Sequence, residues 1–142
     1  MRHQRYNPDF KFVKLPENFN KYTDRELLQY CLGATMYMPG TKDFLPKILN
    51  CAMPGLTTIV FCFEDACAES EVPVAEENVL RTLDAISTAI DNGTLNQDDV
   101  PLIFCRVRNQ EQFVSFSVRL SPHMAKALTG INFSNFNSSI GV

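Results

Sequence analysis

The chain has 142 residues, of which 45% are hydrophobic and 20% charged, and it carries a net charge of −3. This composition is typical of a folded globular domain and argues against a disordered chain. The acidic balance and the lack of a basic run argue against nucleic-acid binding, and the longest apolar run is too short to span a bilayer.

The cysteine pattern and the N-terminus indicate a cytoplasmic protein. The five cysteines form no CxxC motif, which favours reduced, buried thiols over disulfides or a zinc site. The first ten residues are basic but lack the apolar core of a secretion signal. We therefore expect a cytoplasmic location.

Residues 1–22 are polar and aromatic and contain two prolines, so we expect an extended lead-in before the folded unit. Thr23-Asp24-Arg25-Glu26 matches a capping box, with Thr23 as the N-cap of a helix that ends at Gly33. We treat residues 23–142 as one structural unit.

Beyond Gly33, apolar runs predict strands and helical spacing predicts helices, in alternation. The predicted strands are Ala34–Met38, Ile59–Phe63, Pro101–Val107 and Gly130–Phe133. The predicted helices are Phe44–Cys51, Pro73–Asp91 and Glu111–Leu120, and His123–Leu128 either extends the last helix or forms a separate one.

This order predicts an α/β fold of parallel βαβ units. Four strands are about half of an eight-stranded (β/α)8 barrel, and a small doubly wound sheet is the self-contained alternative. In either fold the carboxyl ends of the strands share one edge, which we call the rim.

The rim brings together polar residues that are distant in sequence. The segments that follow the strands are Pro39-Gly40-Thr41, Glu64-Asp65, Arg106 to Asn109, and Ser134-Asn135. Carboxylates directly after a buried strand are costly to desolvate unless they have a role there. The structural alternative is that Asp65 caps the next helix and Glu64 is solvated.

Two acids and two arginines at one rim suit an anionic ligand, because an arginine fork matches a carboxylate or phosphate. The alternative is an internal salt bridge from Glu64 to Arg106 that only braces the rim. Arg106 and Arg108 would share one face if the strand continued through both; if it ends at Val107, Arg108 belongs to the loop and could be a surface residue. Cys62 and Cys67 have no neighbouring base in the sequence, which disfavours a nucleophilic role.

Four segments together resemble a known enzyme family. They are GATMYMPGT, FCFEDACAESEV, PLIFCRVRN and LTGINFSNF, in this order and spacing. They resemble the first half of the HpcH/HpaI aldolase and citrate lyase β-subunit family, and most closely its branch of carbon–carbon bond lyases from stress (tellurite-resistance) operons. The strongest element is the apolar run with Glu-Asp-Ala followed, about 40 residues on, by an apolar run with Arg-Val-Arg.

The resemblance implies a TIM barrel that breaks or forms a carbon–carbon bond next to a carbonyl with Mg²⁺, on a carboxylate-bearing keto acid or acyl-thioester. It implies that Arg106 binds the carboxylate, and that Glu64 and Asp65 organise metal-bound water and the arginine. We therefore take Glu64 and Asp65 as catalytic candidates, and Arg106, Arg108, Pro39 and Gly40 as substrate-binding candidates. The resemblance places the metal ligands on strands five and six, so we expect none within these 142 residues.

Two departures from the family pattern matter. Ser134-Asn135 stands where the family usually has Pro-Lys, and the second half of a barrel does not fall within the 142 residues. A half-barrel exposes strand edges, so we expect a homo-oligomer and no lyase activity from this chain by itself. The alternative function is a non-catalytic anion-binding or assembly module of a stress operon, or a truncated, inactive gene product.

Overall fold

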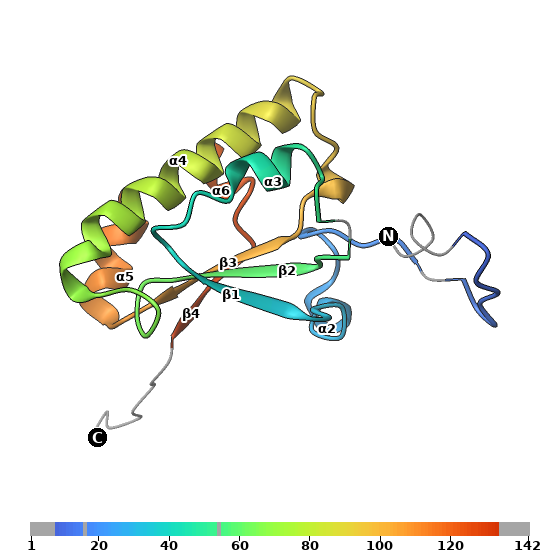
Figure 1. The fold of residues 1–142 in the computed structure, drawn as a ribbon, viewed down its shortest axis with the longest axis horizontal. Coiled ribbons are helices and arrows are strands. Elements are labelled where there is room, and N and C mark those ends of the chain that lie inside the picture. Colours follow the sequence, from blue (N-terminus) through green and yellow to red (C-terminus); the bar gives the residue numbers. More distant parts are fainter. Residues whose placement is uncertain (1–7, 16, 54, 134–142) are drawn as a thin grey trace.

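The computed structural model describes residues 8–15, 17–53 and 55–133, which form one parallel sheet with helices (Figure 1). The strands are β1 (Thr35–Pro39), β2 (Thr58–Cys62), β3 (Leu102–Val107) and β4 (Gly130–Phe133). They are hydrogen-bonded in the order β1-β2-β3-β4, and every neighbouring pair is parallel. The predicted α/β fold of parallel βαβ units is confirmed.

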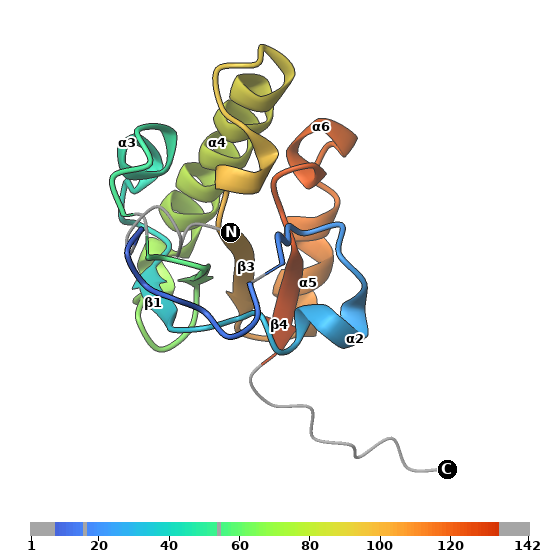
Figure 2. The same ribbon diagram turned by 90° about the vertical axis from the view of Figure 1, so that its right-hand side faces the viewer.

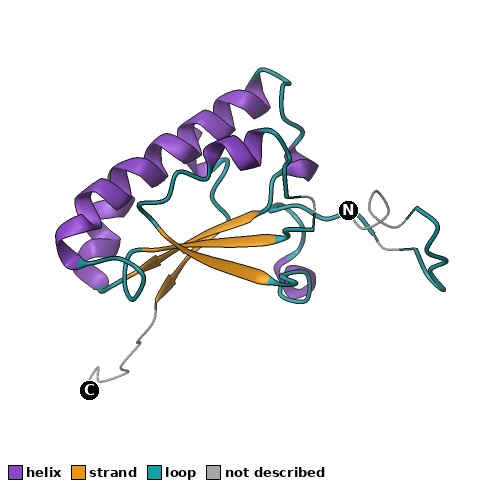
Figure 3. Ribbon diagram, in the orientation of Figure 1, coloured by secondary structure: helices purple, strands orange, loops and turns teal. Residues whose placement is uncertain are grey.

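The helices are α2 (Arg25–Leu28), α3 (Leu45–Leu49), α4 (Val72–Asp91), α5 (Gln110–Ser117) and α6 (Pro122–Ala125). Figures 1 and 2 show α3 to α6 on one face of the sheet, and α2 near the amino ends of the strands. Figure 3 shows the resulting two layers, with α3 to α6 above the strands. Among the described residues, no helix combines the length and the apolar character needed to cross a bilayer.

The first helix is shorter than the sequence predicts, and it begins one residue later. Asp24, not Thr23, is the N-cap: its carboxylate accepts the backbone N–H of Glu26 at 2.9 Å. The Thr23 hydroxyl instead accepts the backbone N–H of Asn20. The helix ends at Leu28, its single buried residue, so little apolar burial supports a longer helix.

The core lies between the sheet and α4. The odd-numbered residues of β2 and β3 face the helices, as does Phe63 directly after β2. Fully buried residues of this set include Ile59, Phe61, Phe63, Ile103 and Val107. The predicted helical stripe meets them there, since Val79, Leu83 and Ile86 of α4 are also fully buried. Side chains alternate between faces along a strand, so the even-numbered positions, Arg106 included, belong to the face opposite the helices.

Gly40 follows β1 where the backbone comes close to the core. A Cβ at this position would lie 2.7 and 2.8 Å from two ring carbons of Phe63 and 3.0 Å from Cβ of Ala75. The Phe63 ring cannot easily move away, because it packs edge-on against Phe116 with ring centroids 5.2 Å apart. Gly40 is thus required by space rather than by backbone conformation.

We therefore expect Gly40→Ala to reduce the free energy of unfolding by about 1–2 kcal/mol, as overpacking of a core does. Chemical denaturation of the purified variant would measure this. Gly55→Ala is the matched control, since nothing lies within 4 Å of its added Cβ. Equal stability of the two variants would show that the Phe63 contact is not restrictive.

Candidate functional site

The register of the sheet places Pro39, Cys62, Arg106 and Asn132 beside one another at the rim. The backbone N–H of Phe63 also donates to the carbonyl of Arg106 at 2.9 Å, which extends the ladder just past β2. The rim lies at the left of Figure 1, where α4 and α5 begin. The fold thus brings the end of β2 against the end of β3, where the sequence places the acids and the arginine.

Glu64, Asp65 and Arg106 meet at this rim. Arg106 Nη2 lies 2.7 Å from Glu64 Oε2 and 3.0 Å from Asp65 Oδ2. The side chains of Arg106 and Glu64 are 23% and 18% exposed, whereas that of Asp65 is 72% exposed. The salt bridge from Glu64 to Arg106 that the bracing alternative requires is therefore present. The solvent-exposed carboxylate of Asp65 contacts the same arginine.

The two carboxylates also affect the pKa of the arginine. Burial by itself would lower the pKa of the Arg106 guanidinium, but the charges of Glu64 and Asp65 outweigh burial and raise this pKa overall. Glu64 Oε2 is buried and accepts no hydrogen bond, although it lies within ion-pair distance of Arg106. We attribute this difference to contact angles outside hydrogen-bond geometry, so the pair is held mainly by charge.

Arg108 follows β3, which ends at Val107, but its side chain does not extend into solvent. Its Nη1 donates to the carbonyls of Phe63 at 2.9 Å, Glu64 at 3.1 Å and Cys67 at 2.9 Å. These carbonyls belong to the loop that carries the two acids. Arg108 thus fixes the loop around Glu64, a role that sequence spacing did not indicate.

A second contact missed from the sequence is made by Gln112 of α5. Its side-chain oxygen accepts the backbone N–H of Arg108 at 2.7 Å, and its amide nitrogen donates to Glu76 of α4 at 3.0 Å. Gln112 and Glu76 are both buried. A glutamine in an amphipathic helix gives no signal of this kind, because the pairing depends on how α4 and α5 pack.

The other substrate-binding candidates lie on different sides of the sheet. Pro39 is half-buried and belongs to the face that carries Arg106. Gly40 instead faces Phe63 and the core, and its carbonyl accepts the side-chain amide of Asn78 at 2.7 Å. Ser134-Asn135, the predicted end of the fourth strand, lies outside the described residues.

The cysteines near the rim are unsuited to nucleophilic chemistry. The Cys62 side chain is fully buried and that of Cys67 almost so. Burial raises the pKa of the Cys67 thiol, and the nearby charge of Glu71 raises it further. A raised pKa reduces the thiolate fraction that would react.

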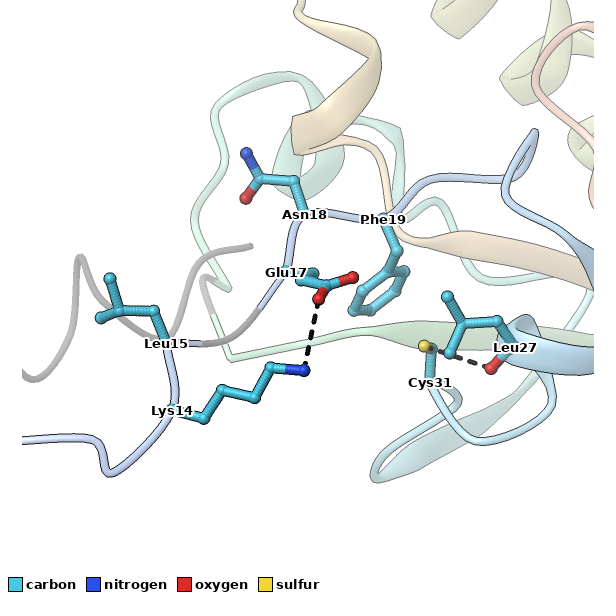
Figure 4. A pocket seen from close by; sticks show the side chains of 7 residues that line it. All are labelled: Lys14, Leu15, Glu17, Asn18, Phe19, Leu27 and Cys31. Atoms are coloured by element: carbon cyan, nitrogen blue, oxygen red, sulfur yellow. Dashed lines mark hydrogen bonds and ion pairs between the residues drawn. The ribbon is translucent and has the colours of Figure 1, made fainter.

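A pocket of about 380 Å³ lies away from the rim, between the lead-in and α2 (Figure 4). Figure 4 shows Lys14 and Glu17 on one side and Leu27 and Cys31 on the other. Lys14 and Glu17 form an ion pair of 3.6 Å in which both side chains are largely exposed. Such pairs contribute little, and this pocket does not present the convergent charges found at the rim.

The described residues do not provide a metal site on their own. They contain no group of three or more histidine, cysteine, aspartate or glutamate side chains placed to hold an ion. The two rim carboxylates already face the positive charge of Arg106, which opposes a second cation at the same atoms. We therefore assign no ligand of a metal ion among the described residues.

Parallel β/α units with charged side chains at the carboxyl rim define an α/β protein of the kind that builds active sites at this edge. Residues 26–141 match the family described as C–C bond lyase of the TIM-barrel fold, and the chain belongs to that family. The described sheet, with four parallel strands, corresponds to part of such a barrel. No curated protein and no solved structure matched the chain. The HpcH/HpaI branch suggested by the sequence motifs stays a prediction.

Proposed function

We propose that the rim around Arg106 binds the carboxylate of a keto acid or acyl-thioester whose carbon–carbon bond a lyase of this family breaks or forms. The observation that supports it is the placement of Arg106. A partly exposed guanidinium is held at the carboxyl edge of a parallel sheet in a chain that belongs to a carbon–carbon lyase family. Arginine is suited to this role because its planar fork matches a carboxylate.

The chain's own residues would orient the substrate. Cleavage next to a carbonyl leaves an enolate, and a fixed positive charge both aligns the substrate and stabilises the negative charge that develops. Glu64 holds Arg106 in place through its buried oxygen Oε2. Arg108 in turn holds the backbone on both sides of Asp65 through its bonds to the carbonyls of Glu64 and Cys67.

Magnesium belongs to this proposal through the family resemblance alone. When bound, it would act as a Lewis acid on the carbonyl of the substrate. No described residue is assigned as its ligand, in keeping with the charge balance at Arg106. The role proposed for Arg106 does not depend on the metal.

A thermal-shift titration with pyruvate, with and without Mg²⁺, tests the proposal on the 142-residue chain. Methyl pyruvate is the matched control, because it keeps the keto group and masks the carboxylate. We expect pyruvate alone to raise the melting temperature, with about 1.4 kcal/mol of stabilisation at ten times its Kd. Equal shifts from acid and ester, or no shift from the acid, would refute carboxylate binding at this rim.

A further inference from the structure

One nitrogen of Arg106 forms ion pairs with two carboxylates, those of Glu64 and Asp65, which differ strongly in solvent exposure. Nη2 lies 2.7 Å from Glu64 Oε2 and 3.0 Å from Asp65 Oδ2. Oxygens of both carboxylates already lie within 3.0 Å of this atom, where each would repel a third anion. A carboxylate that arrived from solvent would therefore have to displace one of the two in order to reach this atom.

Displacing Glu64 would be costly. Its side chain is mostly buried and its Oε2 is shielded from solvent. In such surroundings water solvates a carboxylate poorly once the carboxylate has lost its cation.

Displacing Asp65 would cost little. Its side chain is 72% exposed, and it belongs to the loop after β2 rather than to the strand. Exposed ion pairs contribute little to stability, and water can solvate the released carboxylate. The Asp65 carboxylate also has the charge and the shape of the group that would replace it.

We infer that Asp65 occupies the position on Arg106 that the substrate carboxylate takes on binding, so that binding exchanges one carboxylate for another while Glu64 stays in place. The inference rests on the proposed function, because it assumes that Arg106 is the anion-binding group. Asp65 is then a determinant of affinity: it competes with small carboxylates such as pyruvate. Neutral ligands gain nothing from its removal.

Isothermal titration of the 142-residue chain with pyruvate tests the exchange. We expect Asp65→Asn to bind pyruvate roughly tenfold more tightly than the unchanged chain, because it removes both the competitor and a like charge near the ligand. Asp65→Glu, which keeps the charge, should bind close to the unchanged chain. Glu64→Gln should bind more weakly, because Arg106 loses its fixed partner.

Asp43→Asn is the matched control. Asp43 also forms an exposed ion pair with an arginine, 3.4 Å from Arg81 of α4, so its replacement changes the net charge equally without removing a partner of Arg106. We expect it to leave pyruvate binding unchanged. A tighter complex after Asp65→Asn alone is not what loss of a merely structural contact would give, since a loosened loop weakens binding.

The outcomes distinguish the exchange at Asp65 from the proposed carboxylate binding by Arg106. Unchanged or weaker binding by Asp65→Asn, with binding still lost in Arg106→Gln, overturns the exchange and leaves the carboxylate site standing. Equal pyruvate binding with and without Arg106, or no binding by any variant, overturns both. Equal gains in Asp65→Asn and Asp43→Asn would reduce the effect to net charge and also overturn the exchange.

Discussion

Replacing Arg106 by glutamine is expected to weaken pyruvate binding by about 30-fold, or ~2 kcal/mol. This value is at the lower end of the cost of removing one partner of a hydrogen-bonded charge pair. Glutamine keeps a polar side chain of similar reach but removes the charge that faces Glu64 and Asp65. Isothermal titration would measure the loss. In a lyase assay of any active assembly, the same variant should raise KM or abolish turnover.

Stability distinguishes binding from bracing. Arg106→Gln also leaves Glu64 mostly buried without its cation, which we expect to cost roughly 1–2 kcal/mol, less than for a fully buried pair. The double variant Arg106→Gln with Glu64→Gln removes that unpaired charge. We expect the double variant to regain stability without regaining pyruvate binding. The bracing alternative would be favoured if the double variant regained both. It would also be favoured if the single variants lost stability but kept pyruvate binding.

The sequence predicted the arrangement of the strands and the meeting of charges at the rim. Continuous apolar runs such as Ile59–Phe63 marked the buried strand, and alternation with helices required parallel pairing. Parallel pairing alone was enough to bring Glu64 and Asp65 to Arg106, which lies 42 and 41 residues away in the chain. These inferences depend on the direction of each strand and on whether a residue is odd- or even-numbered along it, and both can be predicted from the sequence.

The sequence could not show how side chains share partners. From the sequence, Arg106 and Arg108 are both candidates for binding the substrate. In the structure, Arg106 forms ion pairs with two carboxylates, whereas Arg108 donates hydrogen bonds to three backbone carbonyls. The difference arises where β3 ends, since Val107 is its last residue and Arg108 turns toward the loop after β2. The cap at Asp24 differs from the prediction because the capping-box spacing from Thr23 to Glu26 favours Thr23, although aspartate is the better N-cap by residue type. The expected homo-oligomer stays a prediction.

The same division of roles predicts that Arg108→Ala acts mainly on stability. Its Nη1 has two hydrogens for three carbonyl acceptors, so at least one hydrogen bond is shared and the three do not add fully. Hydrogen bonds to charged donors contribute about 1.5–3 kcal/mol each, which places the expected loss near 2–4 kcal/mol. Urea denaturation with an unchanged m-value would measure it.

Arg81→Ala is the matched control for losing an arginine, since Arg81 is exposed and pairs with Asp43 at the surface. We expect it to change stability by less than about 0.5 kcal/mol. Arg108→Lys keeps the charge but loses the planar group, so it should recover only part of the stability. Because the freed carbonyls belong to the loop that carries Glu64 and Asp65, Arg108→Ala should also weaken pyruvate binding. Loss of binding with stability equal to that of Arg81→Ala would instead place Arg108 directly on the ligand, as the sequence first suggested.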